Sequence, residues 1–336
     1  MRGRMQSTGA MGAKVCIAVC AWGALAMPAL ARDKKPPVPT QMIVTVVSHE
    51  RGGAPAPTIS SPDVRIEQNG KKDPVLDWKP LPQQATTQLV VLIDDALQGR
   101  SSANFSELQA FILHLPSSVD VALGYMQYGR AMIASGFDSG KVAAAKSVRI
   151  PTGIAGVNAS PYFCISDLAK HWPDGGHPAA VRQVLMITDG IDRYFQALQY
   201  NPQDPYVDFS IVDAQKSRLI ISAIYFRDIG FPDRGMRGSF VGNDYLIQVA
   251  QATGGKDYYE GMGNPVTFVP MLREYTQRLA SAYVLSFGAH GSGLQNLRIS
   301  TKVHGVRLDA PDHVVVGQQL PMVAEPPSVS VAKVSQ

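Results

Sequence analysis

Three continuous apolar runs constrain the fold of this chain more than any other feature of its sequence. Leu89–Ile93, Val184–Thr188 and Leu219–Phe226 lack the alternation of polar and apolar residues that marks a strand with one solvated face. Such strands are normally buried on both faces of a parallel sheet. The segments between the runs show helical periodicity. Strands that alternate with helices predict a doubly wound, Rossmann-like α/β domain, with a mainly parallel sheet and helices on both faces.

Shorter strand patterns flank this domain on both sides. The N-terminal flank contains Asn69-Gly70, a pair that favours a tight hairpin turn, and the C-terminal flank returns to strand patterns after the last helix. Because neither flank has enough strands to be stable alone, we expect them to pair in a small accessory β-sheet or sandwich. The predicted segments are a linker at 32–40, a β-module at 41–87, the α/β domain at 88–281, C-terminal strands at 282–310 and a flexible tail at 311–336.

The first 31 residues have the pattern of a secretory signal peptide. Arg2, Arg4 and Lys14 precede the apolar run 15–26, and small residues follow at 29–31. The alternative is a retained membrane anchor, but the run is shorter than the roughly 20 residues that span a bilayer. We therefore expect a signal peptide at 1–31 and a secreted or periplasmic protein.

Charge and cysteine content exclude two classes of protein. The 336 residues include 31 Lys and Arg against 27 Asp and Glu, a formal charge of +4 that is too small to suggest a nucleic-acid partner. Removal of the signal peptide takes away three cations and leaves +1. The chain has 3 cysteines, which excludes a disulfide scaffold. No other apolar stretch is long enough to cross a membrane.

Three motifs resemble a von Willebrand factor type A domain. They are the strand end Val91–Gln98, the strand end Met186–Gly190 and the helix end Ala252–Gly255. The flanking segments Val64–Gly70 and Tyr283–Phe287 look like those of the bacterial secreted proteins called VWFA-related, first described in acidobacteria. The resemblance implies a type A α/β fold at 88–281 and a function in protein binding or adhesion.

The resemblance also implies a divalent cation at the carboxyl edge of the sheet, held by an Asp-x-Ser-x-Ser loop, a Thr and a further Asp. Asp94 and Asp189 match the two aspartates, and the Thr position falls on Asn158 or Ser160. Ala96 and Gln98 stand where the two serines belong, so the metal motif is degenerate. We expect Asp94, Asp189 and Ser160 to form a weak Mg²⁺ or Ca²⁺ site, or the aspartates to bind the loops that follow them instead.

Two long loops follow strands at the same edge, at 190–206 and 227–242. Ligands of open α/β sheets bind at this edge, and Tyr, Phe and Arg are the side chains that most often dominate protein interfaces. We therefore expect the loops to bind a protein or a cell-surface component. The candidate binding residues are Tyr194, Phe195, Tyr206, Arg227, Arg234 and Arg237.

The sequence offers no established catalytic motif, neither a Gly-x-Ser-x-Gly elbow nor a His-Glu-x-x-His helix nor a Walker loop. We therefore expect a noncatalytic binding protein. Two alternatives stay open. The first alternative is a structural scaffold component of a cell-envelope complex, whose accessory sheet lends an edge strand to a partner. The second is a metal-assisted hydrolase that uses Asp94 and Asp95.

Overall fold

The computed structural model describes residues 36–49, 56–97, 102–154, 159–173, 181–194, 204–227, 236–261 and 263–320. These belong to one compact unit, Pro36–Gln336. The predicted signal peptide at 1–31 lies outside the described residues. None of the helices within the described ranges is long and apolar enough to cross a membrane.

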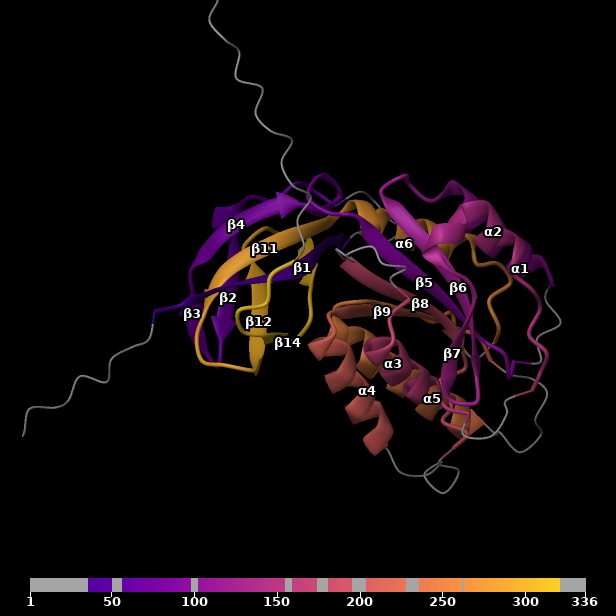
Figure 1. Cartoon of the computed structure of the whole chain (residues 1–336). Helices are drawn as coiled ribbons and strands as arrows, with labels where there is room; N and C mark the ends of the chain where they lie inside the picture. Colours follow the sequence, from indigo (N-terminus) through magenta and orange to yellow (C-terminus); the bar gives the residue numbers. More distant parts are fainter. Residues whose placement is uncertain are drawn as a thin grey trace, which may run out of the picture. The chain divides into compact units, whose positions relative to one another are not determined.

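A six-stranded sheet lies between the helices of this unit, in the right half of Figure 1. Its strands are β5 (Thr87–Asp94), β6 (Val119–Gln127), β7 (Arg130–Ser135), β8 (Val181–Thr188), β9 (Leu219–Tyr225) and β10 (Asp257–Tyr258). The spatial order is β10-β9-β8-β5-β6-β7, in which every neighbouring pair is parallel except β6 and β7. The chain runs from β5 to β6 on one side and from β8 to β9 on the other, so the connections that follow β5 and β8 lead in opposite directions.

Helices cover both faces of this sheet. The helices are α1 (Ser102–His114), α2 (Gly140–Lys146), α3 (Pro161–Lys170), α4 (Pro205–Lys216), α5 (Met236–Thr253) and α6 (Val269–Ala280). Leu89, Val91 and Ile93 of β5 share a buried cluster with side chains of α1, α2 and α6. Val90 and Leu92 point to the other face and pack with α3, α4 and α5. The structure therefore confirms an α/β protein with a mostly parallel sheet between two helical layers.

Two further sheets pack against each other beside this domain. One has the order β13-β1-β11-β4 and the other β14-β12-β2-β3. Their strands are β1 (Val38–Ser48), β2 (Val64–Gln68), β3 (Lys71–Asp73), β4 (Val75–Pro80), β11 (Ala282–Ala289), β12 (Leu294–Thr301), β13 (Val306–Asp309) and β14 (His313–Val315). Val44, Ile66, Phe287 and Leu297 join both sheets in one buried cluster. The flanks thus form a sandwich of two four-stranded sheets, rather than the single sheet that the sequence also allowed.

Several boundaries differ from the sequence-based ones. Strand β1 begins at Val38, inside the predicted linker. The predicted hairpin turn at Asn69-Gly70 connects β2 to β3, and β4 pairs with β11 in the other sheet. The predicted tail contains β14, and the chain stays packed as far as Leu320, which is 5% exposed. Short 3-10 helices span Ser61–Asp63, Leu81–Gln83 and Phe137–Ser139.

Candidate functional site

Asp94 and Asp189 lie at the carboxyl ends of two neighbouring strands. Asp94 is the last residue of β5, and Asp189 directly follows β8. The two strands pair in parallel up to Ile93 and Ile187, so their ends lie at the same edge of the sheet. This is also the point where the connections diverge, which in open α/β sheets creates a crevice for ligands. Both aspartates are buried.

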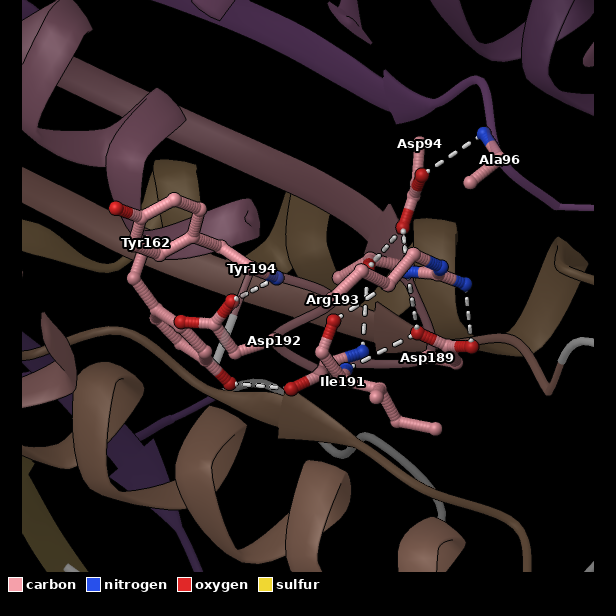
Figure 2. Close-up of polar contacts among 10 residues, drawn as sticks. Asp94, Ala96, Tyr162, Asp189, Ile191, Asp192, Arg193 and Tyr194 are labelled. Carbon is pink, nitrogen blue, oxygen red and sulfur yellow. Dashed lines mark hydrogen bonds and ion pairs between the residues drawn. The ribbon is translucent and has the colours of Figure 1, made fainter. Parts of the chain in front are cut away.

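The guanidinium of Arg193 contacts both carboxylates (Figure 2). Its Nη1 lies 3.3 Å from Asp94 Oδ2 and 3.2 Å from Asp189 Oδ1, and its Nη2 lies 2.8 Å from Asp189 Oδ2. The Arg193 side chain is only 7% exposed. A buried charge is stable only when it is paired and hydrogen-bonded, and here one cation serves two anions. We refer to Asp94, Arg193 and Asp189 as the ion triad.

Further hydrogen bonds fix the carboxylates of the triad. The backbone N–H of Ala96 donates to Asp94 Oδ1 at 2.9 Å, and that of Ile191 donates to Asp189 Oδ1 at 3.0 Å. The hydroxyl of Thr188 donates to Asp94 Oδ2 at 2.8 Å. The turn itself is tight, because a Cβ added to Gly190 would lie 2.3 Å from the carbonyl oxygen of Gly242 in α5. The start of the loop after β8 is therefore held on one side by Asp94, through Arg193, and on the other by the close contact of Gly190 with α5.

These side chains do not fit a divalent cation as they are arranged. A cationic guanidinium already binds both carboxylates, and Ala96 has no side-chain oxygen. Ser160 is the N-cap of α3, where its hydroxyl oxygen accepts a hydrogen bond from the backbone N–H of Phe163. Among the described residues, no group of three His, Cys, Asp or Glu side chains is placed to hold a metal ion. Asn158 and Gln98 lie outside the described residues.

Asp95 belongs to a separate network. Its buried carboxylate binds Arg149, with Oδ1 2.6 Å from Nη1 and Oδ2 2.9 Å from Nη2, and accepts the backbone N–H of Thr152 at 2.8 Å. Gln127 donates a fourth hydrogen bond. Burial alone would raise the pKa of Asp95, but these hydrogen bonds outweigh it and lower the pKa below its ordinary value. Asp94 and Asp95 therefore do not share one cation-binding point.

An aromatic cluster lies beside the ion triad. The rings of Phe163 and Tyr194 are 5.0 Å apart, those of Phe163 and Tyr206 4.8 Å, and those of Tyr194 and Tyr206 5.7 Å. Tyr194 remains 45% exposed. Its backbone N–H donates to Asp192 Oδ1 at 2.8 Å, and the preceding N–H of Arg193 donates to the carbonyl of Ala159 at 3.1 Å. The same loop that places Arg193 therefore also places Tyr194.

A surface groove of about 350 Å³ runs from this cluster to the hairpin between β6 and β7. Tyr128, Gly129, Arg130, Phe163, Ser166, Asp167, Lys170 and Tyr194 line the groove. Tyr128 is 58% exposed and sits at the tip of the hairpin with a φ of 52°. The sequence does not single out this tyrosine, and the local turn signal is the glycine that follows it, Gly129, between two strand patterns.

The predicted binding residues fall into three groups. Tyr194 and Tyr206 come together in the aromatic cluster, where Tyr206 belongs to the first turn of α4. Arg227 follows β9 and is partly buried. Arg237 lies in the first turn of α5 rather than in a loop, because this helix begins at Met236, and its side chain is outside the description. Phe195 and Arg234 also lie outside the described residues.

No family model matches the sequence, and no curated protein matches it. An aerotolerance-related membrane protein from Bacteroides fragilis NCTC 9343, with multiple mutations to serines, has a TM-score of 0.38 at 13% identity, covering 57% of this chain and 98% of that one. The human COPII-coat protein Sec24c has a TM-score of 0.40 at 11% identity, and the match covers 69% of this chain and 44% of that one. The TFIIH p34 N-terminal domain has a TM-score of 0.34 at 14% identity, and the match covers 58% of this chain and 97% of that domain. The α/β class of this chain rests on its own strand order and helix placement.

Proposed function

We propose that this chain is a secreted or periplasmic protein of the VWFA-related kind that binds a protein or cell-surface component without catalysis. The binding surface is the edge of the sheet at which β5 and β8 end. The observation that carries the proposal is the partly exposed aromatic cluster of Phe163, Tyr194 and Tyr206 beside a groove, in which Tyr194 directly follows Arg193 of the ion triad. Tyrosines in such positions supply large contact areas at low entropic cost.

The groove supports a protein partner more than a small molecule. It is open, and its lining combines two tyrosines with Arg130 and Lys170 instead of an enclosed apolar pocket. Tyr, Phe and Arg are enriched among the residues that dominate protein interfaces. We do not propose the hydrolase, because Asp94 and Asp95 bind different arginines.

The scaffold alternative keeps one supporting observation. Strand β4 is the last strand of its sheet, and Leu76 on it is 55% exposed. An outer strand with an exposed apolar side chain is a site where a partner strand adds. In this second candidate function the sandwich, rather than the strand-end face, holds the protein in a cell-envelope complex.

Reciprocal lysine variants separate the two candidates. Tyr194→Lys changes the aromatic cluster, and Leu76→Lys places a charge on β4. Capture of a partner from envelope extract, followed by direct binding of the purified partner, is measured for both variants. The strand-end proposal expects loss of binding with Tyr194→Lys and retention with Leu76→Lys. The opposite pattern supports the scaffold, and retention by both variants refutes both surfaces.

A further inference from the structure

The ion triad places a cation where a divalent metal ion would have to sit. Nη1 of Arg193 lies within hydrogen-bonding distance of one oxygen from each aspartate, so its positive charge bridges the ends of β5 and β8. A metal bound by both carboxylates would have to occupy the space between the same oxygens. It would also meet the repulsion of a guanidinium that is 7% exposed and therefore poorly screened by water.

The remaining donors around the triad strengthen this arrangement. Oδ1 of Asp94 and Oδ1 of Asp189 each accept a hydrogen bond from a backbone N–H. A metal ion bound at either oxygen would have to compete with that hydrogen bond. The carbonyl of Ile191 accepts from Nη1 of Arg193 at 3.3 Å, so the loop closes around its own arginine. Each oxygen of the two carboxylates thus has a donor from the chain.

We infer that Arg193 replaces the divalent cation at this edge, so that the chain supplies its own positive charge and orders the binding face without metal. The statement about binding rests on the proposed function, whereas the statement about the cation concerns the folded chain alone. Arg193 is a positioning residue, because Tyr194 follows it directly and the Arg193 backbone is held by Ala159. Partner recognition through Tyr194 is then insensitive to chelation.

Removal of Arg193 tests the inference without any partner. Arg193→Ala removes the guanidinium and leaves the two buried carboxylates of Asp94 and Asp189, whose oxygens are ligands that a divalent cation prefers. Thermal unfolding is followed in EDTA, in millimolar MgCl₂ and in millimolar CaCl₂. We expect the wild-type Tm to be the same in all three conditions. The Tm of Arg193→Ala should be lower in EDTA and rise by several degrees with at least one of the two ions.

Two variants control for effects unrelated to the charge. Arg193→Lys keeps a cation and should show no response to either metal ion. The double variant Asp94→Asn with Arg193→Ala lacks one carboxylate and should lose the metal response of the single variant. If Arg193→Ala is unfolded in EDTA, refolding on addition of the ion replaces the Tm shift as the measurement.

Two results overturn the inference. One is a wild-type Tm that rises with Mg²⁺ or Ca²⁺, because the folded chain then binds metal despite Arg193. The other is an Arg193→Ala protein that neither gains stability nor refolds with either ion. Neither result bears on whether the strand-end face binds a partner, since no partner is present. Failure of the Tyr194 binding test would in turn leave the metal measurement unchanged.

Discussion

Asp94 and Asp95 are consecutive residues, yet their carboxylates bind different arginines: Asp94 pairs with Arg193 and Asp95 with Arg149. A pair of adjacent aspartates in a sequence suggests a joint acidic centre. Here each carboxylate instead binds one loop: Asp94 binds Arg193 in the loop after β8, and Asp95 binds the backbone of Thr152 in the loop after α2. The strand-end face is therefore built on two separate ionic networks, the ion triad and the Asp95–Arg149 pair.

The Asp95 pair predicts a dependence of stability on acid. Because hydrogen bonds lower the pKa of Asp95, its contribution to stability is present above its ordinary pKa of 3.8 and is lost as the pH falls below it. Arg149→Met should reduce the free energy of unfolding by about 1–2 kcal/mol at neutral pH, a modest loss because Arg149 is 41% exposed. Urea denaturation at a series of pH values from neutral to about pH 3 should show that the difference in free energy of unfolding between the wild type and Arg149→Met becomes smaller. A constant difference would contradict this role of Asp95.

Gly190 predicts a steric requirement at the binding face. It has a φ of 69°, and an added Cβ would also lie 2.7 Å from Cγ of Leu246. Gly190→Ala should therefore lower the free energy of unfolding by more than about 2 kcal/mol. Gly70→Ala is the matched control, since Gly70 in the hairpin turn has a φ of 76° with nothing within 4 Å. Its cost should be about 1 kcal/mol, the backbone strain alone. Equal losses in urea denaturation would rule out the close contact with α5.

Asp257 predicts a loss of stability toward neutral pH. Burial raises the pKa of this carboxyl from 3.8 to about 7, and its Oδ1 has no hydrogen-bond partner. The folded state therefore binds a proton that the unfolded state has released between these two values, and stability falls as the pH rises through that window. Asp257→Asn should flatten the profile by roughly 2–4 kcal/mol between pH 4 and 7. Identical slopes for the two proteins would show that Asp257 ionises normally.

The hairpin tip predicts a conflict between stability and binding. Tyr128 and Gly129 both have positive φ, as a type I′ turn requires, and asparagine adopts this conformation more readily than tyrosine. Tyr128→Asn should therefore raise the free energy of unfolding by about 1 kcal/mol. The same variant should bind the partner of the strand-end face more weakly, because it removes an exposed ring from the groove. A destabilised variant would contradict the turn argument.

The central sheet was predictable because its signal is local and strong. Leu89–Ile93 contains no polar residue, and the structure buries each of its side chains completely. The flanks were harder, because their strands pair across large sequence distances. Thr45 lies opposite Ala282, and no local pattern encodes such a partner. Residues 313–315 form a strand only because β12 is available beside them.

The sequence predicts the two aspartates of the candidate site but not the arginine that binds them. Asp94 and Asp189 each follow an apolar run, so the sequence alone places them at one edge. Arg193 lies in a loop without periodicity, where an arginine is indistinguishable from an exposed binding residue. The spacing of four residues from Asp189 was the one available signal. What decides the role of Arg193 is the turn at Gly190, which is a matter of backbone geometry.

The position of β1 between β13 and β11 has a consequence for the order in which the chain folds. Both neighbours of β1 come from beyond residue 281, so the strand has no partner in its sheet until almost the whole chain has been synthesised. The α/β domain is an insertion between the halves of the sandwich and contains all the strands of its own sheet. We expect a nascent chain to complete this inserted domain first and to close the sandwich last.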